Sequence, residues 1–219
     1  PASFNKDTTL IILNSYSGDT EEILDGFDRG VKEGAHVALL SRGGKLIQKG
    51  KELGAPYIEL PESNLEPRFS IGHQLIGLLT LMGQTEKIRL LKEKIELVSS
   101  EQAQETGKAW SDILQRKYPV IYASSSFYPV AYLIKAAINE GAKIPSFVNT
   151  IPEANHNELQ SFVTDDTTNE KDTFAFLFLS SYFDHQRFTK SFSVMKELYE
   201  KRGYTVIHTT KDVNNITET

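Results

Sequence analysis

The stretch Thr8–Ser15, TTLIILNS, followed at once by Tyr16–Glu22, YSGDTEE, decides the fold class of this chain. The first part is a short, continuous apolar run with β-branched residues, which is typical of a strand buried on both faces. The second part is a polar turn with one glycine, in which Asp19 or Thr20 can serve as the N-cap of a helix with an acidic first turn. We therefore expect a strand, a tight turn and a helix that ends at Gly34.

Strand and helix signals alternate along the rest of the chain. The further strands that we expect are His36–Leu40, Tyr57–Leu60, Pro119–Ala123, Ser146–Thr150, Thr173–Leu179 and Tyr204–His208. The further helices that we expect lie near residues 45–53, 68–82, 86–98, 101–116, 129–140, 157–162 and 185–202. This alternation predicts parallel sheets with helices on both faces. A strand that opens into a serine-rich turn occurs once per half, so we expect two tandem α/β domains with a boundary near residues 98–101.

Composition excludes several classes of protein. The net charge of −5, with no stripe of lysine and arginine, argues against a nucleic-acid-binding protein. No apolar run reaches the roughly 18 residues of a membrane span, so we expect no membrane partner. The 219 residues include no cysteine, which excludes disulfides and thiolate metal sites and is compatible with the reducing cytoplasm where we expect the protein.

The turn after the first strand has the chemistry of an anion site. Ser15, Ser17 and Thr20 supply hydroxyl donors, Gly18 lets the backbone approach closely, and the helix N-terminus adds free N–H groups. The alternative is that these residues only cap the helix, which on spacing alone is the more common role. The Ser124–Ser126 turn has a similar context with less glycine, and capping is the stronger interpretation there.

The string SYSGDTEE resembles the phosphate-binding signature of SIS (sugar isomerase) domains. Further segments resemble, in order, elements of the bifunctional phosphoglucose/phosphomannose isomerase branch of that family. They are SRGGKL at Ser41–Leu46, the Pro67-Arg68 pair, Ala131-Tyr132 with Lys135, INEGAK at Ile138–Lys143, and PEANHN at Pro152–Asn157. The resemblance implies a flavodoxin-like three-layer architecture in two tandem SIS domains, residues 1–98 and 99–219.

The resemblance also implies roles for single residues. It implies that Ser15, Ser17 and Thr20 bind the substrate phosphate. Glu140 is implied as the base that moves a proton between C1 and C2, and Arg68 as the residue that stabilises the negative charge of the enediolate. His156 is implied as the ring-opening residue, which in this family reaches the site from a neighbouring subunit of a homodimer.

The implied activity is the interconversion of glucose 6-phosphate, mannose 6-phosphate or both with fructose 6-phosphate through a cis-enediol. The substrate is a phosphorylated hexose, and the chemistry needs no cofactor and no metal. Three departures from the family pattern stand out. Gly141 replaces the usual asparagine, and we expect that the chain lacks both the opening strand with its glycine-rich turn and the closing helix of the family.

Other interpretations remain open on the residues alone. Glu140 at a helix end is the kind of glutamate that is usually solvated, and Arg68 is the kind of arginine that usually forms a surface ion pair. His156, near Glu153 and Glu158, could suggest a metal site, but the expected loop has no regular ligand spacing. A non-catalytic sugar-phosphate-binding SIS module, or an isomerase for phosphorylated pentoses or heptoses, are the rival functions.

Overall fold

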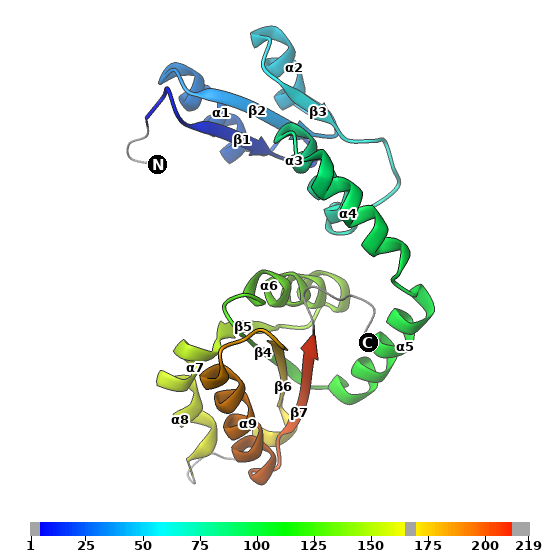
Figure 1. The fold of residues 1–219 in the computed structure, drawn as a ribbon, viewed down its shortest axis with the longest axis vertical. Coiled ribbons are helices and arrows are strands. Elements are labelled where there is room, and N and C mark those ends of the chain that lie inside the picture. Colours follow the sequence, from blue (N-terminus) through cyan, green and yellow to red (C-terminus); the bar gives the residue numbers. More distant parts are fainter. Residues whose placement is uncertain (1–4, 165–169, 212–219) are drawn as a thin grey trace. The chain divides into compact units, whose positions relative to one another are not determined.

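The computed structural model describes residues 5–164 and 170–211. The chain divides into two compact units, Pro1–Glu93 and Lys94–Thr219, and the division falls inside helix α4 (Thr85–Glu96). Each unit has its own parallel sheet (Figure 1). The predicted α/β class, with parallel sheets flanked by helices, is confirmed.

The first unit is built on a parallel sheet that is covered on both faces. In sheet order its strands are β1 (Leu10–Asn14), β2 (His36–Ser41) and β3 (Tyr57–Glu59). The helices are α1 (Glu21–Lys32), α2 (Gly44–Leu53), the 3-10 turn η1 (Pro67–Phe69) and α3 (Ile71–Leu81). Phe27 of α1 and Leu46 of α2 pack on one face against Leu39. On the other face Gly77 of α3 lies against Leu40, the next residue of β2. Since successive side chains of a strand alternate between the two covered faces, β2 is apolar from Val37 to Leu40.

The second unit repeats the plan with a larger sheet. In sheet order its strands are β5 (Phe147–Thr150), β4 (Tyr118–Ala123), β6 (Phe174–Ser181) and β7 (Thr205–Lys211). The helices are α5 (Ser100–Leu114), α6 (Tyr128–Ala137) with the π-helical turn η2 (Ile138–Ala142), α7 (Ile151–His156), α8 (Glu158–Val163), the 3-10 turn η3 (Glu170–Asp172) and α9 (Gln186–Lys201). Helices α5 and α6 pack on the face of Ile121 and Ala123. Helices α7, α8 and α9 pack on the face of Val120 and Tyr122.

The segment before His156 is a helix, so our prediction of a loop there is wrong. Pro152 lies in the first turn of α7, where its missing N–H group costs no hydrogen bond. Ile151 and Ala154, three residues apart, are both fully buried against the sheet. The proline that we interpreted as a loop signal is therefore a helix-start signal, and tertiary burial holds this short helix in place.

Two further predicted helices differ in local geometry. The helix expected over residues 129–140 is α-helical only to Ala137, and residues 138–142 form a π-helical turn that ends at Lys143 in a left-handed conformation with φ of 60°. Arg68, expected as the first residue of a long helix, lies in the separate turn η1, ahead of α3. Among the helices of the described residues, none is long and apolar enough to span a bilayer.

Candidate functional site

The serine-rich turn after β1 is held together by its own hydroxyl groups. The side chain of Ser15 is only 5% exposed, and its Oγ atom accepts a hydrogen bond from the N–H group of Gly18 at 3.1 Å. The same oxygen lies 2.8 Å from Oγ1 of Thr20 and shares a hydrogen bond with it. Thr20 occupies the N-cap position of α1, but its side chain makes no capping hydrogen bond. The simple capping interpretation therefore does not describe Thr20, whose hydroxyl belongs to the turn.

A second turn, Ser41–Lys45 after β2, is locked against the first. Gly18 has a φ of 79°, and a Cβ atom placed on it would lie 1.9 Å from the carbonyl oxygen of Gly43. Gly44 has a φ of 70°, and a Cβ atom there would lie 2.5 Å from the carbonyl oxygen of Ser17. Each glycine therefore makes room for the backbone of the other turn, which explains why both turns carry glycine at these places.

Backbone hydrogen bonds fix the contact between the two turns. The N–H group of Arg42 donates to the carbonyl of Tyr16 at 3.0 Å, and that of Leu46 donates to the carbonyl of Gly18 at 2.9 Å. Oδ1 of Asp19 accepts from the N–H group of Lys45 at 3.1 Å, so the carboxylate caps the start of α2. The second turn thus serves as a rigid support for the first.

The loop that carries Arg68 is tied to the same edge of the sheet. The hydroxyl of Tyr16 donates to the carbonyl of Leu65 at 3.1 Å. Nδ2 of Asn14, the last residue of β1, donates to Oε1 of Gln74 at 2.9 Å, and Nε2 of Gln74 donates to Oγ of Ser70 at 2.6 Å. The structure therefore brings the predicted phosphate turn and the predicted arginine loop together at the carboxyl ends of the strands.

The Arg68 side chain lies within that loop and is mostly covered, with 28% of it exposed. It forms an ion pair with Glu66, and its guanidinium carbon lies 5.1 Å from the centre of the Phe69 ring. Its Nε atom is buried and has no hydrogen-bond partner among the described residues. The guanidinium is thus a cation held in place by the carboxylate of Glu66 and the ring of Phe69.

Glu140 lies in the second unit, on the π-helical turn η2, and its side chain is exposed. Turns of π-helix are rare in proteins and are frequent at functional sites. Oδ1 of the neighbouring Asn139 is buried with no hydrogen-bond partner among the described residues. The turn therefore presents a carboxylate to solvent next to an amide whose acceptor is unused.

His156 ends α7 and is also exposed, but it lies on the other side of the sheet from Glu140. Ala131 of α6 packs with Ile121, whereas Ala154 of α7 packs with Tyr122, the next residue of β4. Because neighbouring residues of a strand face opposite ways, the two helices cover opposite faces. The structure does not bring Glu140 and His156 together within one copy of the second unit.

The serine turn of the second unit is occupied by a carboxylate of the chain itself. Ser126 donates its hydroxyl hydrogen bond to Oδ1 of Asp184 at 3.1 Å, and the N–H group of Ser181 donates to Oδ2 of Asp184 at 2.7 Å. Oγ of Ser124 shares a hydrogen bond with Oγ of Ser126 at 3.0 Å. The donors at this turn already hold an anion. The N-cap residue of α6 is Phe127, without a side-chain capping hydrogen bond, so our interpretation of these serines as helix caps is wrong.

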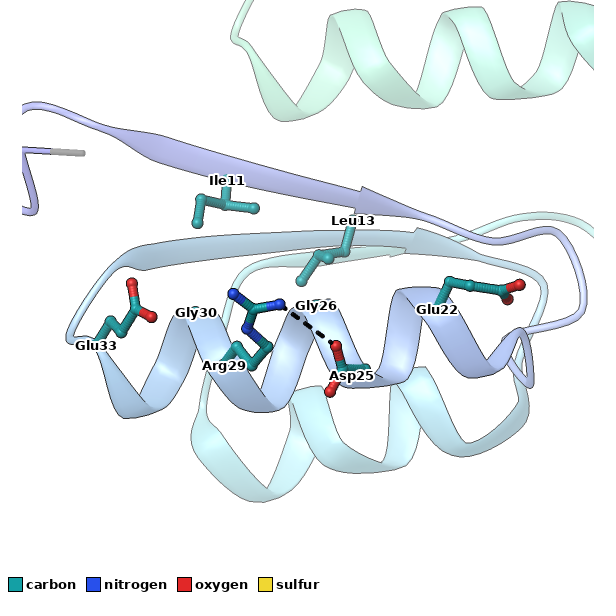
Figure 2. A pocket seen from close by; sticks show the side chains of 8 residues that line it. All are labelled: Ile11, Leu13, Glu22, Asp25, Gly26, Arg29, Gly30 and Glu33. Atoms are coloured by element: carbon teal, nitrogen blue, oxygen red, sulfur yellow. Dashed lines mark ion pairs between the residues drawn. The ribbon is translucent and has the colours of Figure 1, made fainter. Parts of the chain in front are cut away.

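A hollow of about 230 Å³ lies between β1 and α1 in the first unit (Figure 2). Its floor is formed by Ile11, Leu13 and the glycines at positions 26 and 30. Its rim carries the carboxylates of Glu22, Asp25 and Glu33 and the guanidinium of Arg29, which lies 3.8 Å from Asp25. With three acids and one paired base, this hollow is unsuited to a phosphate.

The described residues contain no cluster of three or more histidine, aspartate or glutamate side chains that could hold a metal ion. Glu153 and Glu158, which flank His156 in the sequence, are instead used as hydrogen-bond acceptors within the chain. Sequence reasoning missed these acceptors and the cap made by Asp19. The position of Asp19 in a polar turn could have indicated a capping role. No sequence pattern indicates that Glu158 accepts hydrogen bonds from Tyr122 and Asn149.

Residues 103–219 match the family model of the bacterial phospho-glucose isomerase C-terminal SIS domain. The chain belongs to this family. A curated relative from Thermoplasma volcanium, the bifunctional phosphoglucose/phosphomannose isomerase, is 34% identical over 90% of the chain and 62% of its own length. The D-glucosamine-6-phosphate 4-epimerase of Sulfolobus acidocaldarius is 31% identical over 70% of the chain and 51% of its own length. The SIS chain spans less than two thirds of the length of either relative.

Solved structures agree on the fold of this SIS-family chain. The C-terminal domain of glucosamine-fructose-6-phosphate aminotransferase from Francisella tularensis is similar with a TM-score of 0.67. The similarity covers 92% of the SIS chain and 58% of that domain, at 15% sequence identity. At this identity the likeness establishes the fold alone.

Proposed function

We propose that the chain is part of an aldose–ketose isomerase that interconverts glucose 6-phosphate, mannose 6-phosphate or both with fructose 6-phosphate. The observation that carries the proposal is the Ser15–Thr20 turn, which is built around a buried hydroxyl and locked by Gly18 against its neighbour. Membership of the phospho-glucose isomerase family and the name of the Thermoplasma relative support a phosphorylated sugar as the ligand.

In this proposal the substrate phosphate binds at the start of α1. Ser15, Ser17 and Thr20 donate hydroxyl hydrogen bonds, and the free N–H groups and dipole of the helix N-terminus add to the attraction. None of these donors titrates near neutral pH, so they hold a dianion over a wide pH range. We propose that this unit, residues 1–98, is an SIS domain in tandem with the C-terminal SIS domain, residues 99–219.

The reaction needs a base, a fixed cation and a proton donor. Glu140 is the base that transfers a proton between C2 and C1, which contributes a factor of about 10² to 10⁴ in rate. Arg68 stabilises the negative oxygen of the enediolate, because its guanidinium stays cationic and lies in the loop that is tied to the phosphate turn. His156 donates a proton to the ring oxygen of the closed sugar. Because glucose and mannose 6-phosphate differ only at C2, both lead to the same planar enediol.

The proposal includes a homodimer in which His156 acts in the site of the neighbouring subunit. The packing of α6 and α7 on opposite faces of one sheet supports this arrangement, because it separates Glu140 from His156 within the unit. A site that needs both side chains would then be completed by a second copy of the chain.

The test is to express the complete reading frame that contains these residues and to change Glu140 to Gln. Isomerisation of fructose 6-phosphate should fall by a factor of about 100 or more. Glu200→Gln is the matched control, since Glu200 is an exposed glutamate of α9 paired with Lys196 at 3.8 Å. If the Glu140→Gln protein isomerises fructose 6-phosphate at the parental rate, the proposed mechanism is wrong. A parental protein that binds fructose 6-phosphate in calorimetry without converting it would favour a non-catalytic sugar-phosphate-binding module.

A second candidate function is the epimerisation of a phosphorylated amino sugar at C4, favoured by the similarity to the Sulfolobus enzyme of that name. The two functions differ in product. Incubation of the complete protein with glucosamine 6-phosphate and with fructose 6-phosphate, followed by NMR of the products, separates them. An inverted C4 centre in the first incubation, with no change in the second, would replace the isomerase proposal.

A further inference from the structure

A polar cluster lies beneath the short helix that carries His156. Its centre is the carboxylate of Glu158, the first residue of α8, which is partly buried. Oε2 of Glu158 accepts a hydrogen bond from the hydroxyl of Tyr122 on β4 at 2.7 Å. Oε1 accepts one from Nδ2 of Asn149 on β5 at 2.5 Å. A single carboxylate therefore binds two neighbouring strands and the start of a helix.

Both donors to this carboxylate are fixed in place. Tyr122 is fully buried, and burial, followed by the nearby Tyr199 and Glu158 itself, raises the pKa of its hydroxyl. The phenol therefore keeps its proton and remains a donor at any physiological pH. Asn149 is oriented by its own Oδ1 atom, which accepts from the N–H group of Thr150 at 2.8 Å. With the amide oxygen used in this way, the amide nitrogen is left to face Glu158.

The cluster closes a short loop of chain around α7. Asn149 precedes the helix and Glu158 follows it, so their hydrogen bond joins the two ends of the segment. Inside the loop, Ile151 and Ala154 are fully buried against the sheet. The helix is therefore held from below by packing and from both ends by one hydrogen-bonded pair.

A second set of bonds brackets His156 directly. Oδ1 of Asn157 accepts from the N–H group of Glu158 at 2.6 Å, and Nδ2 of Asn157 donates to Oε1 of Glu153 at 2.7 Å. His156 lies between these partners in the sequence, so its backbone is fixed on both sides while its ring stays exposed. A histidine that donates a proton to a substrate needs an accessible ring and a fixed backbone, because proton transfer requires one defined geometry.

Stability alone does not account for the carboxylate. Even a partly buried carboxylate has a desolvation cost, and apolar residues of similar volume are often as stable or more stable in the place of buried charges. What a carboxylate provides and an apolar residue cannot is a directional link to two donors at once. Such links are best attested where they select one arrangement of the chain.

We propose that Glu158, held by Asn149 and Tyr122, is a positioning residue that fixes the place of His156 for ring opening. This inference rests on the proposed function, since it needs His156 to act on the substrate. It adds a residue that contacts neither the substrate nor the reacting atoms, and it assigns the purpose of the polar cluster.

The experiment is a double-mutant cycle in the complete protein. Glu158→Gln replaces one acceptor oxygen by an N–H donor, which can no longer pair with one of its two donor partners. We expect kcat/KM for fructose 6-phosphate to fall about 10- to 100-fold, since a misplacement of about 1 Å can reduce a rate by about 100-fold. The double variant Glu158→Gln/His156→Asn should be no slower than His156→Asn alone, because the lost positioning acts only through the histidine. Glu197→Gln, an exposed glutamate of α9 paired with Lys201 at 2.5 Å, should keep the parental rate.

Each result has a distinct meaning. If Glu158→Gln keeps the parental rate while His156→Asn is slow, the positioning role is wrong and the proposed function stands. If the loss in kcat/KM of the double variant equals the product of the two single losses, Glu158 acts independently of His156, and the inference is also overturned. If His156→Asn keeps the parental rate, the ring-opening role in the proposed function fails, and the inference with it. Should Glu158→Gln not fold, Tyr122→Phe removes only one donor at nearly constant volume, and the same cycle is measured with it.

Discussion

At residue 18 the chain leaves no room for a side chain. The carbonyl oxygen of Gly43 occupies the place of a Cβ atom, and the positive φ adds conformational strain for any other residue. We expect Gly18→Ala to lower the free energy of unfolding by about 3 kcal/mol or more. Urea unfolding followed by circular dichroism measures this loss. Gly72→Ala is the control, because a Cβ atom there meets nothing within 4 Å, and a stability equal to or above the parental one is expected.

A second prediction at the residue scale concerns His208. Burial, and after it the charge of Lys196, lower the pKa of this histidine in the folded protein. An unfolded histidine has a pKa of about 6.5, so between the folded pKa and this value the unfolded chain binds more protons. The stabilising contribution of neutral His208 is therefore complete above about pH 6.5 and is lost as the pH falls below it.

The variant that tests this linkage is His208→Gln, which keeps a polar group near Ser180, whose Oγ atom lies 3.0 Å from Nε2 of His208. The difference in the free energy of unfolding between about pH 7.5 and about pH 5 should become smaller than in the parental protein. The exposed His36, at the start of β2, provides the control variant His36→Gln, which should keep the parental difference. An undiminished pH dependence in His208→Gln would contradict the assignment.

At the scale of elements, the π-helical turn η2 tolerates a larger residue than glycine. A Cβ atom at Gly141 would meet nothing within 4 Å, and its φ lies outside the left-handed region. We expect Gly141→Ala to raise the free energy of unfolding by about 0.5 to 1 kcal/mol, since alanine loses less backbone entropy on folding. Gly54, the C-cap of α2, is equally open but has a φ of 72°. Gly54→Ala should therefore lower the free energy of unfolding by about 1 kcal/mol. Thermal unfolding measures both variants, and melting temperatures that change in the same direction for Gly141→Ala and Gly54→Ala would contradict this prediction.

The order and type of most elements could be predicted from the sequence because the strands are continuous apolar runs between turn residues. β2, β4 and β6 are examples, and burial on both faces is the reason for their uniform character. Helix α7 was missed because it is only six residues long and its apolar face has two positions. The π-helical turn also follows from packing, since no local pattern distinguishes it from the end of an α-helix.

The candidate site was predictable in part. The turn that holds Ser15 follows from a strand, a glycine and hydroxyl residues in sequence, whereas its lock against Gly44 joins residues far apart in the chain. The same holds for the bond of Asp184 to Ser126, in the turn after β4, and for the bond of Glu158 to Tyr122 on β4. Patterns within a segment can be seen in a sequence, but the pairing of polar groups across a sheet edge depends on the folded arrangement.

At the scale of the whole molecule, the opposite faces of α6 and α7 lead to a complementation test. Glu140→Gln and His156→Asn proteins should each be nearly inactive, but a mixed dimer would keep one site with both native residues. After refolding from an equal mixture, roughly a quarter of the parental activity should return, since half of the dimers are mixed and half of their sites are intact. Glu140→Gln mixed with the double variant Glu140→Gln/His156→Asn should recover nothing. Failure of the first mixture to recover would argue against a histidine donated between subunits.

The carboxylate of Asp184 has a consequence for how many anions one chain can take up. The chain has a serine turn in each unit, but in the second unit the hydroxyl of Ser126 and the N–H group of Ser181 are bonded to a counter-anion supplied by the polypeptide. Free phosphate would have to displace a tethered group that is always present at high local concentration. For the proposed isomerase we therefore expect one phosphosugar to bind per chain, at the turn after β1, and calorimetry would measure this stoichiometry.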